Sequence, residues 1–208
     1  MSVRDPVLKP VPIIELRPTQ MTVGRREVAE KRRAIRDRAG GDVAEFLGRH
    51  MIPVLLGPKA RHFIIDHHHL ACALHAEGVA NVAVNVMADL SRLSKGEFWV
   101  FCDNRGWCHP FDDKGVRRDY DLIPKSISGL ADDPFRSLAG ELRRAGGFSK
   151  EAEPFEEFMW ADFLRRRVKR DLVEEDFGAA LTRALTLARS AAADHLPGWC
   201  GPSSPPGK

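Results

Sequence analysis

The most reactive side chains of the sequence gather in one short run, Asp66-His67-His68-His69. Imidazoles beside a carboxylate can transfer protons near neutral pH, hydrogen-bond phosphate oxygens or bind a metal ion. The run stands between an apolar segment, 62–65, and a helix-forming stretch that stops at Gly78. The start of a helix binds anions because its first N–H groups lack helical partners and its dipole is positive there. We therefore expect Asp66, His67, His68 and His69 to form a phosphate-binding catalytic site.

Structural explanations of the same run stay open. Asp66 has the residue type and the position of a helix N-cap, and Gly78 those of a left-handed residue after the helix. One of the histidines could simply be packed in the core. His68, Cys72 and His75 share one helical face and could bind Zn²⁺, although such a face could equally pack against a sheet.

A second polar cluster is Asp132-Asp133-Pro134-Phe135-Arg136-Ser137. Paired carboxylates can hold Mg²⁺ while a following arginine binds phosphate. The same residues also form a common helix opening, with Asp133 as N-cap and Pro134 in the first turn. Asp66, Asp132 and Asp133 are the candidate Mg²⁺ ligands.

Composition limits the class of protein. The chain has 208 residues, of which 43% are hydrophobic and 29% charged, as in a soluble globular protein. The net charge of +3 falls short of the concentrated basic stripe of duplex-binding proteins, and runs such as Arg165-Arg166-Arg167 are typical of solvated helix faces. The sequence shows no signal peptide and no apolar run long enough to span a bilayer, which favours a cytoplasmic protein without a membrane partner. Four cysteines are too few for a disulfide framework, so we expect reduced thiols.

Residue patterns predict a chain of strands followed by helices. The two apolar segments 51–56 and 62–65 flank a loop containing Gly57-Pro58 and predict a hairpin. The other expected strands are 9–16 and 81–87. The expected helices are two between 24 and 50 with a break at Gly40-Gly41, and then 67–77, 90–100, 137–144, 154–170 and 175–195.

The segment from Ile64 to Leu74, with Leu16-Arg17-Pro18-Thr19-Gln20 upstream, resembles the ParB/sulfiredoxin superfamily. In that superfamily a strand ends in an Arg/Pro/Gln-type turn, and a hairpin leads to a short polar motif at a helix start. The segments 132–140, 154–165 and 196–199 are similar to the ParB-like nuclease family, so the resemblance covers residues 8–199. It implies an α+β fold in which a small mixed-sheet domain is followed by a mainly helical C-terminal region.

The expected organisation has four parts. They are a ParB/sulfiredoxin-like domain at 8–97, a loop-rich connector at 98–124, a helical region packed on the first domain at 125–199, and a disordered tail at 200–208.

The superfamily includes partition proteins that hydrolyse CTP, sulfiredoxins, free-serine kinases and nucleases, so fold alone does not fix the activity. Here Leu70 stands where arginine is common, no cysteine directly precedes the histidines, and Gln20 stands where the kinases carry a carboxylate. These differences argue against CTP switching and against sulfinic acid reduction.

The resulting functional expectation is an enzyme, a phosphotransferase or phosphohydrolase, that binds a nucleotide or another phosphorylated small molecule. It would use Mg²⁺ for phosphoryl transfer or phosphate-ester hydrolysis, with one of the three histidines as general acid or base. The residues expected to bind the substrate phosphates are Arg17, Thr19, Gln20, Asp132, Asp133, Arg136, Ser137 and Arg143. The alternative is a ParB-like DNA-binding protein or nuclease. A DNA-binding module would need a helix-turn-helix with a basic recognition helix, which the sequence does not show.

Overall fold

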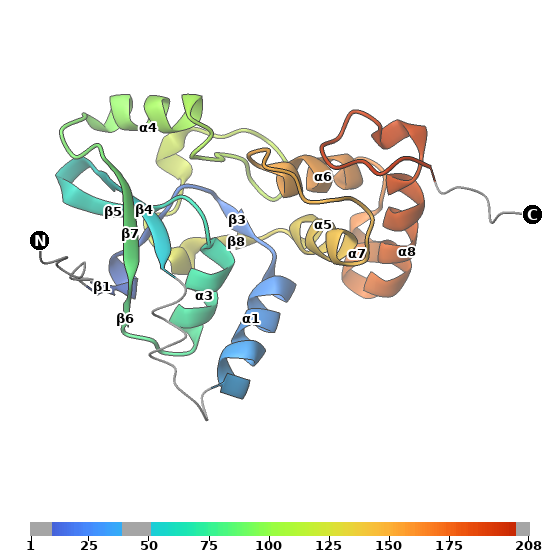
Figure 1. Ribbon diagram of the computed structural model, residues 1–208, viewed down its shortest axis with the longest axis horizontal. Coiled ribbons are helices and arrows are strands. Elements are labelled where there is room, and N and C mark those ends of the chain that lie inside the picture. The colour runs from blue at the N-terminus through green and yellow to red at the C-terminus, as the bar shows by residue number, and fades with distance from the viewer. Residues whose placement is uncertain (1–9, 39–50, 203–208) are drawn as a thin grey trace, which may run out of the picture. The chain divides into compact units, whose positions relative to one another are not determined.

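The computed structural model describes residues 10–38 and 51–202, and the packing divides them into two compact units (Figure 1). The first unit contains residues 10–21, 28–38, 51–110 and 118–130. The second unit contains residues 22–27, 111–117 and 131–202. Mixed sheets and helices confirm the predicted α+β class. The four-part division of the sequence stays a prediction.

A four-stranded mixed sheet is the centre of the first unit. Its strands, in spatial order, are β2 (Arg17–Pro18), β5 (Arg61–Ile64), β4 (Ile52–Gly57) and β7 (Val84–Asp89). β5 pairs in parallel with β2 and antiparallel with β4, while β7 runs parallel to β4. The predicted hairpin is therefore confirmed. Its connection is a 3₁₀ turn, Pro58–Ala60.

The predicted strand 9–16 is interrupted. β1 (Val11–Pro12) pairs antiparallel with β6 (Asn81–Val82), and a 3₁₀ turn, Ile13–Glu15, follows before β2 begins. Proline lacks the N–H that a longer ladder needs, which is consistent with these short pieces. The turn redirects the chain from one sheet to the other.

Three helices belong wholly or partly to the first unit: α1 (Arg25–Arg38), α3 (His68–Ala76) and α4 (Lys95–Asn104). α3 ends before Gly78, whose φ of 75° confirms the predicted left-handed glycine. α4 begins five residues later than predicted, because Ser94 and Glu97 form a capping box there. The second helix predicted before residue 50 lies outside the described residues.

Aromatic rings join α4 to the sheet. Phe98 of α4 packs on Phe63 of β5 with ring centroids 4.6 Å apart, and Trp99 contacts both rings. Cys102 is fully buried in this cluster, and burial raises the pKa of its thiol to about 12. None of the four cysteines, all of which lie in the described residues, forms a disulfide in the structure.

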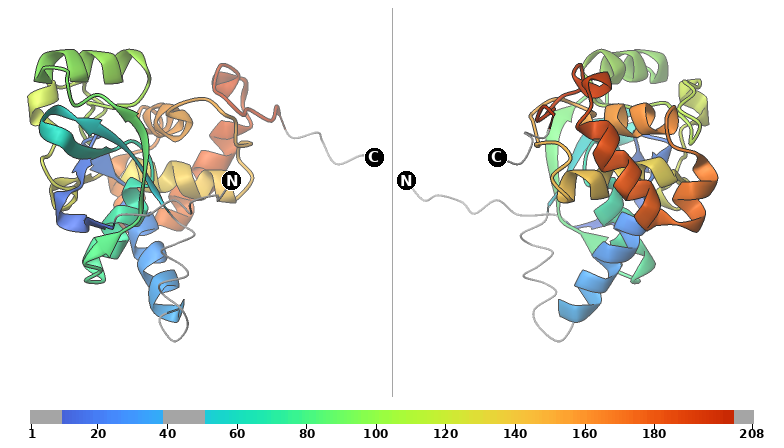
Figure 2. Two further views of the ribbon diagram at one scale, coloured as in Figure 1. Left: turned by 60° about the vertical axis from the view of Figure 1, so that its left-hand side comes forward. Right: turned by 90° about the vertical axis from the view of Figure 1, so that its right-hand side faces the viewer.

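Helices form most of the second unit (Figure 2). Their bounds are α5 (Pro134–Arg144), α6 (Glu156–Arg165), α7 (Arg170–Glu175) and α8 (Phe177–Ala188). A short parallel ladder joins β3 (Thr22–Val23) to β8 (Ala131–Asp132), directly before α5. The helix predicted at 154–170 is in fact α6 followed by a break at 166–169.

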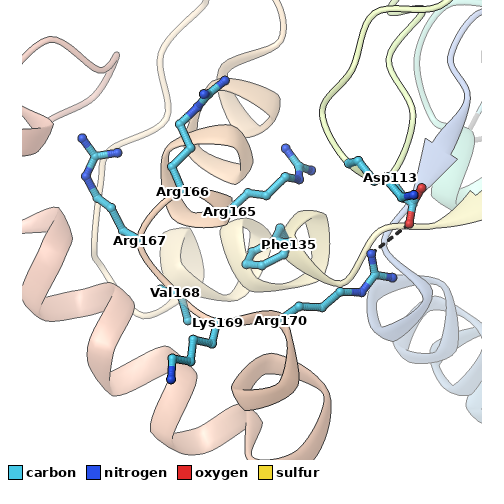
Figure 3. A pocket seen from close by; sticks show the side chains of 9 residues that line it. Asp113, Phe135, Arg165, Arg166, Arg167, Val168, Lys169 and Arg170 are labelled. Carbon is cyan, nitrogen blue, oxygen red and sulfur yellow. Dashed lines mark hydrogen bonds and ion pairs between the residues drawn. The ribbon is translucent and has the colours of Figure 1, made fainter.

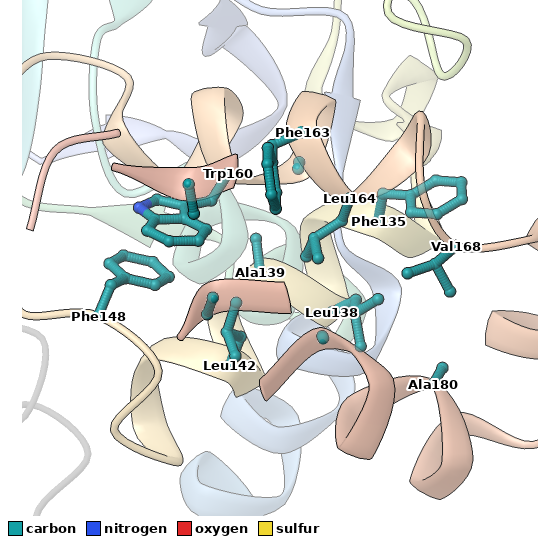
Figure 4. Close-up of a cluster of buried hydrophobic side chains, with 14 of the residues drawn as sticks. Phe135, Leu138, Ala139, Leu142, Phe148, Trp160, Phe163, Leu164, Val168 and Ala180 are labelled. Atoms are coloured by element: carbon teal, nitrogen blue, oxygen red, sulfur yellow. The ribbon is translucent and has the colours of Figure 1, made fainter. Parts of the chain in front are cut away.

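The core of the second unit lies between these helices (Figure 4). Trp160 of α6 is fully buried and stacks on Phe148 with ring centroids 4.5 Å apart. Its indole nitrogen donates to the carbonyl oxygen of Pro197 at 2.9 Å. This hydrogen bond satisfies the one polar atom that the buried indole carries into the core. Across the described helices, none combines the length and apolarity that a membrane span requires.

Two arginines of α1 form ion pairs that should make the stability of the protein depend on pH in the acid range. Arg32 and Arg36 both bind Glu77 at the end of α3, and their hydrogen bonds lower the pKa of that carboxyl from 4.5 to about 2. A carboxyl with a lowered folded-state pKa stabilises the fold above its unfolded pKa, and this contribution disappears as pH falls toward the folded value. We expect Glu77→Gln to flatten the dependence of melting temperature on pH between about 4.5 and 2. Glu153→Gln, which removes an exposed carboxylate, should leave that dependence unchanged.

Candidate functional site

The carboxyl ends of β2 and β5 bring two polar segments together in the first unit. Because the strands are parallel, with Pro18 opposite Ile64, both ends meet at one edge of the sheet. Ligands of α/β proteins commonly bind at such edges. We call the residues that follow the two strands the strand-end site: Thr19, Gln20, Asp66, His67, His68 and His69.

A hydrogen bond links the two segments. The backbone N–H of Thr19 donates to Nε2 of His68 at 3.3 Å, and the Thr19 hydroxyl donates to the carbonyl oxygen of Ile64 at 2.8 Å. Both side chains are buried. Because Nε2 of His68 accepts, the proton of the neutral ring lies on Nδ1. His68 therefore positions the start of α3 against β2.

Asp66 and His67 face solvent at the same edge. His67 occupies the N-cap position of α3 in the left-handed region, with φ 63° and ψ 25°, and its side chain does not cap the helix. Asp66 was predicted to be the cap; instead its Oδ1 accepts from the N–H of His67 at 2.6 Å. The turn thus presents a carboxylate and an imidazole beside the positive end of a helix dipole.

Gln20 and His69 are buried next to this pair, at 6% and 9% exposure. Gln20 forms an isolated parallel bridge with His109, whose N–H donates to the carbonyl oxygen of Thr19 at 2.8 Å. His109 is a site neighbour that sequence reasoning missed. It lies in the loop after α4, where no periodic pattern marks it.

Arg17, the remaining predicted residue of the first unit, is half-buried on β2. Burial and the charge of Arg61 lower the pKa of its guanidinium. It lies upstream of the strand end, in register with Phe63.

The predicted carboxylates of the second unit hold backbone in place. Asp133 caps α5 by accepting from the N–H of Phe135 at 3.0 Å, and it pairs with Arg165. Asp132 accepts from the N–H of Arg25 at 2.9 Å, and the hydroxyl of Ser137 accepts from the N–H of Arg26 at 3.3 Å. The prediction of Asp133-Pro134 as a helix opening is confirmed.

Arg136 and Arg143 converge on a single carboxylate, Glu157 of α6. The distances from Arg136 Nη2 and Arg143 Nε to that side chain are 3.5 and 3.0 Å. Arg136 is 5% exposed, and its guanidinium lies 3.4 Å from the ring centroid of Phe158. Burial lowers its pKa. These contacts attach α5 to α6.

The donor set gives no support to a bound divalent ion. No three His, Cys, Asp or Glu side chains gather as a metal site in residues 10–38 and 51–202. Asp132 and Asp133 already accept hydrogen bonds from the backbone. On the proposed zinc face, His68 accepts from Thr19 and the Cys72 sulfur contacts the Ile127 carbonyl oxygen at 3.7 Å. Binding of Mg²⁺ stays a prediction.

The left-handed backbone of His67 can be tested by stability. A β-branched residue is strongly disfavoured there, whereas asparagine tolerates the conformation. We expect His67→Val to lower the free energy of unfolding by about 1–2 kcal/mol. His67→Asn should stay within about 0.5 kcal/mol of the wild type in urea denaturation. Equal losses for both variants would argue against the left-handed turn.

The neighbouring residues Asp132 and Asp133 allow a matched comparison of an exposed and a buried carboxylate. Asp133 is 1% exposed, whereas Asp132 is exposed. Asp133→Ala removes a cap and leaves Arg165 without its buried partner, so we expect a loss of about 3–5 kcal/mol in urea denaturation. Asp132→Ala should cost about 1 kcal/mol or less. Similar costs would contradict a structural role specific to Asp133.

Known proteins are similar to this chain in sequence and in fold. A crystal structure of protein Atu1540 from Agrobacterium tumefaciens is similar to this chain, with 52% sequence identity and a TM-score of 0.87. The match covers 94% of this chain and 99% of that one. No curated protein matches. The family model described as "Putative ParB-like nuclease" matches residues 9–166. The chain therefore belongs to the ParB-like nuclease family.

Proposed function

We propose that the protein is a nuclease that hydrolyses phosphodiester bonds of nucleic acid at the strand-end site. The observation that carries this proposal is the exposed pair Asp66 and His67 at the start of α3. The family description supports the choice of nucleic acid as substrate.

The start of α3 suits a phosphodiester, because its N-terminal turn can stabilise the anionic oxygens. Buried Thr19 and His68 fix the position of that turn. The residues around the anion thus need little rearrangement during reaction, which is how preorganised sites lower a barrier.

His67 is the proposed general base. Its imidazole takes a proton from a water molecule, the water oxygen bonds to phosphorus, and the bond from phosphorus to the leaving sugar oxygen breaks. The leaving oxygen regains a proton from solvent. Asp66 holds the backbone of His67 through Oδ1, and its other oxygen remains able to orient the water.

The proposal favours nucleic acid over the phosphorylated small molecule of the Mg²⁺-dependent scheme. That scheme named Asp66, Asp132 and Asp133 as Mg²⁺ ligands, whereas Asp132 and Asp133 each accept a backbone hydrogen bond and Asp133 also pairs with Arg165. No step is therefore assigned to a metal ion.

The test is cleavage of fluorescent single-stranded DNA, duplex DNA and RNA, each with EDTA and with Mg²⁺. We expect cleavage by the wild type and a loss of about 10²–10⁴-fold in kcat for His67→Asn, which retains the backbone conformation. His75→Gln, on the last turn of the same helix, is the matched control and should remain active.

The results separate the candidates. Absence of cleavage of all three nucleic acids by the wild type would overturn the proposal. Hydrolysis of mononucleotides without cleavage of any strand would support the small-molecule reading instead. Equal activity of the His67→Asn variant and the wild type would remove His67 from the reaction.

A further inference from the structure

A basic pocket lies in the second unit (Figure 3). Its volume is about 510 Å³, and six cationic side chains line it: Lys114, Arg165, Arg166, Arg167, Lys169 and Arg170. Phe135 and Val168 add apolar surface, and Asp113 is the acidic residue among the lining side chains. These residues come from the 111–117 loop, the start of α5, the end of α6, the segment 166–169 and the start of α7.

Ion pairs fix part of this lining. Arg165 binds Asp133 and Asp162, and its side chain is only 14% exposed. Arg170 bridges Asp113 and Glu174 at 2.9 and 2.7 Å. These arginines are ordered before any ligand arrives, so binding them costs little side-chain entropy.

The pocket carries an excess of positive charge. The acids that pair with its six cations are Asp113, Asp133, Asp162 and Glu174, which leaves two charges uncompensated. Lys114 and Lys169 make no ion pair with any residue that the structure describes, and both are exposed. Arg167 donates to the carbonyl oxygen of Phe163 and lies 4.0 Å from that ring's centroid. A ligand with at least two negative charges would complete this electrostatic balance.

The size and shape of the pocket restrict the class of ligand that it can bind. Pockets for small ligands measure about 300–1,000 Å³, so this volume accommodates a nucleotide-sized group. Phe135 and Val168 line the pocket but are only 2% and 5% exposed, so a ligand meets mainly the basic side chains, which can bind phosphates. A duplex presents a convex surface and cannot place a whole nucleotide in such a cavity.

We propose that this pocket binds nucleotide phosphate units, supplied either by a flexible single strand or by free nucleotides. The inference goes beyond the proposed nuclease activity, because binding here requires no cleavage and no residue of the strand-end site. Arg165 and Arg170 hold the phosphates in fixed positions, and Lys114 and Lys169 supply charge that no carboxylate among the described residues neutralises.

The test measures the affinity of the protein for a fluorescein-labelled 12-nucleotide single strand. Binding is detected by fluorescence anisotropy at salt concentrations of 50–200 mM. All proteins carry His67→Asn so that the strand stays intact, which a gel verifies. The pocket variant is Lys114→Glu/Lys169→Glu. The control is Lys125→Glu/Lys150→Glu, which changes net charge equally at exposed lysines outside the pocket.

We expect the pocket variant to weaken strand binding by about tenfold or more, and the control by less than about twofold. The slope of log affinity against log salt should fall by about 1.4, since each phosphate contact to a single strand contributes about 0.7. Both lysines lack ion pairs, so the melting temperature should be unchanged in the pocket variant.

A competition with AMP and ADP identifies the source of the phosphates. Displacement of the strand by ADP at micromolar concentration points to a free nucleotide, and resistance to ADP points to a strand. Equal losses in the pocket and control variants would overturn the inference, because they would indicate general electrostatic attraction. Pocket-dependent strand binding, together with no cleavage of any nucleic acid by the protein that retains His67, would support this inference while the nuclease proposal fails.

Discussion

The pairing of β5 on both of its edges is the constraint on which the strand-end site depends. β5 bonds to β2 on one side and to β4 on the other, so the direction of β2 is fixed relative to the hairpin. Beyond the last ladder pair, the N–H of Thr19 has no strand partner, and His68 provides the acceptor. A buried backbone N–H rarely stays unpaired. His68 is therefore buried, where it accepts this hydrogen bond, whereas His67 is exposed to solvent.

Buried charge has a comparable role in the second unit. Asp133 is buried, and it connects the start of α5 to Arg165 at the end of α6. Arg136 is equally enclosed, and Glu157 with the ring of Phe158 replaces the water that its guanidinium loses. Isolated charges would be costly at these positions, whereas pairing makes them compatible with a folded core. The same pairing sets the direction of the arginines along one side of the basic pocket.

Local sequence signals were sufficient for much of the fold. The hairpin followed from two apolar segments around Gly57-Pro58, and the start of α5 followed from Asp133-Pro134. Residue types also singled out Asp66 to His69. The start of α4 was predicted five residues too early, because Ser94 and Glu97 form the capping box that begins the helix. The cap of α3 was misplaced because a left-handed histidine is unusual there.

What the sequence could not supply were contacts between distant segments. Thr19 and His68 are 49 residues apart, and only the parallel pairing of their strands brings them together. The arginine run at 165–167 was interpreted as a solvated face, since nothing in the sequence places Lys114 beside it. Ion pairs to Asp133 and Asp113 cannot be read from helical periodicity. Chemistry was thus visible in the residue types, but its geometry depended on tertiary pairing.

The order of segments in the second unit has a consequence for synthesis on the ribosome. β3 is made early, yet its partner β8 comes about a hundred residues later in the chain. At about 5–20 residues per second, that delay lasts roughly 5–20 s. During this time β3 lacks the ladder partner that β8 provides in the folded protein. Because the second unit also contains residues 131–202, it can complete its fold only after its C-terminal helices have been synthesised.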